Sequence, residues 1–201
     1  MKRWLFLLAG FFLLSSLAGA APSPCLSESL AKYIELGSGG CSIGGATFAN
    51  FGYSAKTTGG AAQIPPDQIQ VTPLFVVPAG FGLTFTAAWK AASGQTLDAY
   101  IKYMVQPGVP NLNQTGTLSL KMGAFHLGTI GTVTVQGETT FGDLRTVAEC
   151  ANLCTAPKAD FLEFWPTAPV AVLNHVSLVP KTGGASLASF TATIDLCPLC
   201  V

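Results

Sequence analysis

Three segments of this sequence alternate strictly between apolar and polar residues, and this alternation constrains the fold more than any other feature. Because successive side chains of a strand point to opposite faces of a sheet, alternation of this length is typical of strands with one buried face. The segments cover residues 81–90, 97–105 and 188–196. Their expected buried residues are Phe81, Leu83, Phe85, Ala87 and Trp89 in the first, Leu97, Ala99, Ile101, Tyr103 and Val105 in the second, and Ala188, Phe190, Ala192, Ile194 and Leu196 in the third.

Weaker strand-like segments accompany these three, and turns rich in glycine or proline separate them. Short strands at these intervals, with no helix between them, predict an all-β fold: a two-sheet antiparallel sandwich of jelly-roll-like type. No internal repeat or linker divides the chain, so residues 46–201 are expected to form one β-sandwich domain. The weaker segments read TFANFGY, QIQVTPL, TLSLKM, GTVTVQG, DFLEFW and VAVLNHVSLV.

One short helix is expected ahead of the strands, over residues 28–36. Apolar residues recur there at helical spacing, Ser27 can cap the start, and Gly37 suits the position after the end. Residues 21–45 are therefore predicted to form an N-terminal helix and a disulfide-tied loop.

The first twenty residues have the layout of a secretory signal peptide. Lys2 and Arg3 precede an apolar run, and small residues at 18–20 form a cleavage site. The apolar run is too short for a stable membrane span. We expect cleavage after Ala20, which leaves a chain of about 180 residues that is secreted, extracellular or at the cell surface.

The expected mature chain carries few charges. Removal of Lys2 and Arg3 leaves eight of the ten basic residues against ten acidic ones, a formal charge of about −2. No basic run or stripe remains, which argues against nucleic acid and anionic membrane surfaces as partners.

Six cysteines follow the signal peptide, and an even number in an exported chain favours disulfides. The terminal CPLC sequence also has the spacing of a redox pair or of half a zinc site, whose other half could come from the CANLC sequence at 150–154. An oxidising compartment favours disulfides over zinc. Proximity in the sequence suggests the bridges Cys25–Cys41, Cys150–Cys154 and Cys197–Cys200.

No catalytic, cofactor or metal constellation stands out, so we expect no enzyme. Gly40 and Gly45 have the spacing of a phosphate-binding loop but lack its lysine and its helix, which makes this turn scaffold. His126 in a predicted loop and His175 in a predicted strand lack the sequence context of a nucleophile. No motif gathers the acids that a glycosidase or calcium site would need. The acids considered are Asp143, Glu149, Asp160 and Glu163.

Two aromatic residues are candidates for contact with a glycan. Tyr100 falls on the outer phase of its strand, and Trp165 precedes a proline at a strand end. Exposed aromatic rings on a sandwich can stack on sugar rings, whereas packing at a sandwich edge is the more frequent role of such residues.

The stretch GGCSIGGATFANF, residues 39–51, resembles a recurrent opening of uncharacterised exported bacterial proteins, many of which carry a PEP-CTERM sorting tail. The resemblance continues through residues 69–73, through the strand that contains Trp89, and through a mid-chain cysteine pair, here Cys150 and Cys154. It implies an exported protein and carries over no catalytic residue. This sequence departs from the pattern because it has no Pro-Glu-Pro motif and no C-terminal apolar helix, so we expect release or self-association.

Together these features predict a non-enzymatic exported protein with a structural or adhesive role at the cell surface or in the extracellular matrix. One version is a fibre subunit that lends residues 21–40, or its last strand, to the sheet edge of a neighbouring copy. The alternative is a carbohydrate-binding β-sandwich module. The expected partners are accordingly further copies of the chain or an extracellular polysaccharide.

Overall fold

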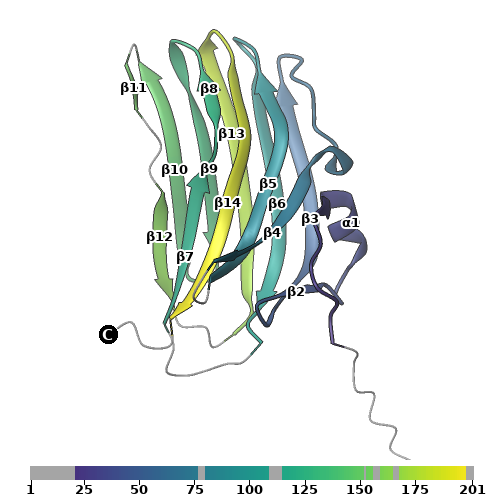
Figure 1. The fold of residues 1–201 in the computed structure, drawn as a ribbon. Coiled ribbons are helices and arrows are strands. Elements are labelled where there is room, and N and C mark those ends of the chain that lie inside the picture. The colour runs from purple at the N-terminus through teal and green to yellow at the C-terminus, as the bar shows by residue number, and fades with distance from the viewer. Residues whose placement is uncertain are drawn as a thin grey trace, which may run out of the picture.

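The computed structural model describes residues 21–76, 80–108, 115–151, 153–155, 159–164 and 168–197. Over these residues the chain forms two antiparallel sheets of seven strands each, packed face to face (Figure 1). The predicted all-β, two-sheet antiparallel sandwich is therefore confirmed. In the described part of the chain, no helix is long and apolar enough to span a bilayer.

The first sheet, which we call the β14 sheet, has the strand order β1-β4-β5-β14-β7-β12, and β8 pairs with the end of β14. The second, the β13 sheet, has the order β11-β10-β9-β13-β6-β3-β2. The strands of the β14 sheet are β1 (Glu28–Ser29), β4 (Gln70–Val76), β5 (Gly80–Ala91), β14 (Ala185–Cys197), β7 (Thr115–Met122), β12 (Asp160–Phe164) and β8 (Phe125–Leu127). Those of the β13 sheet are β11 (Cys154–Thr155), β10 (Gly142–Ala151), β9 (Ile130–Thr139), β13 (Val170–Thr182), β6 (Thr96–Gln106), β3 (Ala46–Thr58) and β2 (Cys41–Ile43).

The core lies between the two sheets and is rich in aromatic rings. All ten residues predicted to point inward from the segments at 81–90 and 97–105 are buried. Phe85 of β5 stacks on Phe190 of β14 at a centroid distance of 4.9 Å, and it meets Tyr103 of β6 at 6.0 Å. These rings join the two sheets because each contributes a large apolar area and a favourable offset geometry.

The predicted phase of the third segment is wrong at its start. The register between β14 and β5 shifts between Leu187 and Ser189, so Leu187 and Phe190 are both buried while Ala188 is exposed. Such an irregularity resets the alternation of a strand, and no period-two pattern can reveal it. From Phe190 onward the predicted alternation holds for the buried Ile194, whereas Ala192 is only half-buried.

The helix is shorter than predicted. Helix α1 spans Leu30–Glu35, because Glu28 and Ser29 form strand β1 against β4 and cannot join the helix. Ser29, and not Ser27, caps it, since its hydroxyl accepts a hydrogen bond from the Lys32 backbone N–H at 3.4 Å. A further 3-10 helix spans Pro66–Gln68 and leads into β4.

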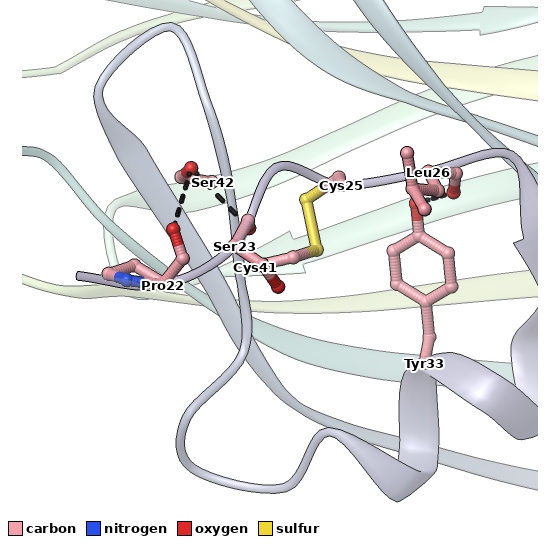
Figure 2. The surroundings of a disulfide bond; sticks show 7 residues. All are labelled: Pro22, Ser23, Cys25, Leu26, Tyr33, Cys41 and Ser42. Atoms are coloured by element: carbon pink, nitrogen blue, oxygen red, sulfur yellow. Dashed lines mark hydrogen bonds between the residues drawn. A yellow bond between two sulfur atoms is a disulfide. The ribbon is translucent and has the colours of Figure 1, made fainter. Parts of the chain in front are cut away.

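The N-terminal segment lies along one side of the sandwich (Figure 1), where a disulfide ties it down (Figure 2). Pro24 forms a bridge with Ser42 of β2, and the Cys25 N–H donates to the Ser42 carbonyl at 3.0 Å. A disulfide joins Cys25 to Cys41, and the hydroxyl of the buried Tyr33 donates to the Leu26 carbonyl at 2.7 Å. Since β1 then pairs with β4, this segment passes from the edge of the β13 sheet to the edge of the β14 sheet.

On the other side, a carboxylate connects the two sheets. Asp160 begins β12, and its side chain accepts a hydrogen bond from the Arg145 backbone N–H of β10 at 2.7 Å. It also accepts one from the Phe161 N–H at 3.0 Å. Asp160 thus satisfies a backbone donor at the edge of β10, a structural role.

Candidate functional site

Two aromatic rings stack on the outer face of the β13 sheet. Tyr100 of β6 and His175 of β13 are register partners in an antiparallel pair, so their side chains leave the sheet side by side. The rings are nearly parallel, with an interplanar angle of 11° and a centroid distance of 4.3 Å. Cross-strand aromatic pairs of this kind are among the stronger side-chain pairs of a sheet.

The Asp98 carboxylate holds the His175 ring at its edge, in addition to the Tyr100 ring on its face. Asp98 precedes Tyr100 by two residues on β6, so it shares its face. Its Oδ1 accepts a hydrogen bond from Nε2 of His175 at 2.8 Å. The His175 and Asp98 side chains remain 21% and 26% exposed, respectively, so solvent and ligands reach both. A ring held both at its edge and on its face loses rotamer freedom before any ligand arrives, which favours binding.

The two faces of the Tyr100 ring have different neighbours. Because His175 covers the face toward β13, the opposite face is turned toward β3, where the register partner of Tyr100 is Ser54. Its neighbour in the next outward position of β3 is Gly52. The Lys102 side chain lies across Gly52, whereas Ser54 beside the Tyr100 ring is short.

A hollow of about 480 Å³ lies on the same face, one step further along the strands. Its rim and floor include Lys102 and Met104 of β6, Ala171 and Leu173 of β13, and Glu138 of β9. Lys102 pairs in register with Leu173, which pairs in turn with Glu138. The floor of the hollow is therefore apolar and its two sides carry opposite charges.

A register shift in β3 shapes one wall of this hollow. The pairing of β3 with β6 shifts between Ala49 and Gly52, and Asn50 within the shift has a φ of 56°. Asparagine tolerates this left-handed conformation better than most residues. Asn50 also lines the hollow, so the irregular backbone brings an amide side chain to the edge of the candidate site.

The two predicted glycan-contact residues have different outcomes. Tyr100 lies on the outer face, as its phase predicted, and is half-buried by its neighbours. Trp165 lies outside the described residues. Sequence reasoning missed Asp98 and His175 as its companions, since only the pairing of β6 with β13 brings residues 77 positions apart together.

The candidate acids form no glycosidase or calcium site within β10 or within β12. Asp143 and Glu149 are six residues apart on β10, which places them about 20 Å apart along the strand. Asp160 and Glu163 are three residues apart on β12, so they point to opposite faces. Among the described residues, no group of three or more His, Cys, Asp or Glu is placed to hold a metal ion.

The remaining candidates are structural or outside the described region. Cys25–Cys41 and Cys150–Cys154 are disulfides, as predicted, so neither Cys150 nor Cys154 is available to zinc. Cys200 lies outside the described residues, as does the side chain of Cys197. His126 is not in a loop as predicted: it lies in β8, where pairing with β14 places it opposite Ser186.

Comparisons with known proteins give only distant similarities. No protein-family model matches the chain, and no curated protein matches it. Among solved structures, it is similar to the enzymatically active domain of tailspike protein 4 of bacteriophage CBA120, with 14% identity, a TM-score of 0.30 and 74% of this chain covered. It spans about a fifth (19%) of that protein.

Two carbohydrate-binding modules are also similar to it. One is TmCBM61, solved with β-1,4-galactotriose, at 8% identity and a TM-score of 0.27, with 72% of this chain and 87% of that chain covered. The other is described as a carbohydrate-binding module of the β-sandwich superfamily, at 14% identity and a TM-score of 0.22, covering 86% of this chain and 61% of that one. At these TM-scores neither similarity bears on the site.

Proposed function

We propose that this protein is an exported, non-enzymatic glycan-binding β-sandwich module that uses the outer face of the β13 sheet. The observation that carries the proposal is the Tyr100 ring, which lies on an accessible face with His175 stacked behind it and Asp98 fixing the imidazole. The sequence predicted a carbohydrate-binding module with Tyr100 and Trp165 as its glycan contacts. In the proposed site, His175 and Asp98 accompany Tyr100.

A sugar matches this arrangement chemically. The C–H face of a pyranose ring is apolar and its edges carry hydroxyls, so it needs a flat apolar surface with polar groups around it. The face of the Tyr100 ring turned away from His175 supplies the surface. Asp98, Ser54 and Lys102 supply acceptors and donors at neighbouring outward positions.

A purely structural role by strand donation has less support. The segment at 21–40 is paired with β2 through Ser42 and with β4 through β1, and a disulfide ties it down at Cys25. The last strand, β14, lies between β5 and β7. Both segments that were predicted to donate a strand to a neighbouring copy are therefore already paired with strands of their own chain. An adhesive role is still compatible, since a surface protein that binds glycans adheres to them. The two disulfides suit an exported protein.

The direct test is a binding titration of the full mature chain against a panel of soluble polysaccharides by isothermal calorimetry. Tyr100→Ala is expected to weaken binding about ten-fold or more, because it removes the stacking surface. Tyr100→Phe keeps the ring and is expected to stay within a few-fold of the unchanged protein. Thr191→Val, on the outer face of the β14 sheet, is the matched control and should bind normally. Binding that survives Tyr100→Ala unchanged would overturn the proposal.

A further inference from the structure

The hollow next to Tyr100 bears on the size and charge of the ligand. We propose, building on the proposed function, that the binding site continues from Tyr100 along β6 into this hollow and takes at least two consecutive neutral sugar units. The Tyr100 ring would hold one unit and the hollow the next.

The two subsites are continuous along the strands. Tyr100, Lys102 and Met104 are successive outward residues of β6, spanning about 13 Å. On β13 the corresponding outward residues are His175, Leu173 and Ala171. A single pyranose ring is shorter than this row. A ligand that uses both the ring and the hollow must therefore contain more than one sugar unit.

The floor of the hollow matches the apolar face of a sugar. Leu173 is half-buried at its centre, flanked in register by Lys102 and Glu138, and Ala171 and Met104 continue the apolar surface. Because the ammonium and the carboxylate lie on opposite sides of Leu173, one side offers hydrogen-bond donors and the other offers acceptors. Hydroxyl groups at the two edges of a sugar ring can use both.

The Lys102 side chain is positioned by the residue next to it on β3. A Cβ added at Gly52 would come within 2.5 Å of Cε of Lys102 and 3.1 Å of its Cγ, so the lysine lies across the glycine. The absence of a side chain at Gly52 is thus what lets Lys102 lie along the sheet as a wall of the site.

The charge distribution favours a neutral ligand over an acidic one. Glu138 is the register partner of Asp143 on β10, so two exposed carboxylates lie on the side of the hollow opposite Lys102. Within the described residues, no ion pair joins any of these three groups to a partner. The hollow itself is lined by one ammonium, from Lys102, and one carboxylate, from Glu138, so it offers a uronic acid no net positive charge.

The test is calorimetry with a chain-length series, from one to four units, of a neutral polysaccharide that the protein binds. For the unchanged protein, affinity is expected to rise ten-fold or more between one unit and three. Leu173→Ser should remove most of this gain while leaving the affinity for a single unit intact. Val179→Ser, an outward residue of the same strand beyond the hollow, is the control and should keep the gain.

A second variant covers the case in which Leu173→Ser does not fold. Glu138→Gln changes an exposed residue and is expected to lower the affinity for the longer units several-fold, with no change for the single unit. An oxidised series with uronate in place of the neutral sugar should bind more weakly. Equal affinity for one and three units, or tighter binding of the uronate series, would overturn this inference while leaving the proposed function standing. Binding of every length that is unchanged by Tyr100→Ala would overturn both.

Discussion

The outer faces of the two sheets are built from the polar phase of the same alternating pattern, yet they differ in kind. On the β14 sheet several central outward residues are short hydroxyl side chains that bond to one another across strands: Thr84 to Thr191 at 3.0 Å, and Ser119 to Thr193. On the β13 sheet, central positions carry the long side chains of Tyr100, Lys102 and His175, and Lys102 also lines the neighbouring hollow.

The difference shows why a polar face is not by itself a binding face. Hydroxyls that pair with neighbours have fewer donors and acceptors left for a ligand, and they offer no flat apolar surface. The β13 sheet combines a stacked ring, an apolar floor and charged side chains at the edges of the hollow, a combination typical of ligand sites.

The largest expected effect is the loss of stability on removing a disulfide. The two described disulfides lie at opposite edges of the β13 sheet. In the chain-entropy view, removing the Cys25–Cys41 bridge by alanine substitution should lower the free energy of unfolding by about 3 kcal/mol, and removing Cys150–Cys154 by about 2 kcal/mol, because the second loop is shorter. Urea denaturation measures both. Glycan affinity at low denaturant should not change, since the site lies on the central strands; a loss of affinity in the folded variants would contradict the assignment of the site.

Glycines on the two faces should respond differently to an added methyl group. At Gly82 of the β14 sheet a Cβ would lie 2.3 Å from the Ala192 carbonyl oxygen and 2.7 Å from Cα of Thr193. Backbone atoms cannot move aside, so Gly82→Ala should destabilise by about 1–3 kcal/mol without altering binding by the folded fraction.

Gly52→Ala on the β13 sheet should give the opposite result. The obstructing atoms belong to the flexible Lys102 side chain, which can move away, so the cost in stability should be within about 0.5 kcal/mol. The displaced lysine should lower the affinity for oligosaccharides several-fold. Thermal melts and calorimetry on both variants distinguish the two cases, and equal effects on stability would refute the contrast.

Alkaline titration can probe the buried inner face of strand β6. Burial raises the pKa of Tyr103, on the inner face, to about 12, partly offset by a hydrogen bond from Asn174. Burial also raises the pKa of Tyr33 under α1 to about 12, with the Glu28 charge adding to the effect. Ionisation is therefore easier in the unfolded chain, where tyrosine titrates near 10.

The protein is therefore expected to lose stability as Tyr33 and Tyr103 ionise. Below pH 10 the stabilisation by the two neutral tyrosines is fully present, and it is lost as the pH rises from about 10 to about 12. Absorbance at 295 nm should show Tyr33 and Tyr103 ionising late in the native state, with unfolding setting in over the same range. Tyr103→Phe should remove one of these late steps.

A small effect, confined to stability, is expected from the hydroxyl pairs of the β14 sheet. Thr191→Val removes one hydrogen bond with Thr84 at constant shape, so the loss of stability should be about 1 kcal/mol or less. Binding should be unaffected. A clear loss of glycan affinity in this variant would move the site to the other face.

Much of the fold could be predicted from the sequence because it depends on local alternation. The buried phases of β5 and β6 follow from residues two apart, and the two described disulfides join cysteines close in the chain. The prediction failed where long-range pairing overrode the local pattern. Glu28 and Ser29 became a strand because β4 offered them partners, and Ala188 turned outward where the register of β14 shifts.

The sequence by itself determined that Tyr100 lies on the outer side of its strand, since the phase of β6 is set by its apolar residues. Only the tertiary structure decided what surrounds that ring. The order of strands in a sheet depends on packing of the whole core, and it placed β13 beside β6 and so brought His175 onto Tyr100 and Asp98. A site assembled from register partners on separate strands leaves no spacing in the sequence, because strand neighbours are chosen in three dimensions.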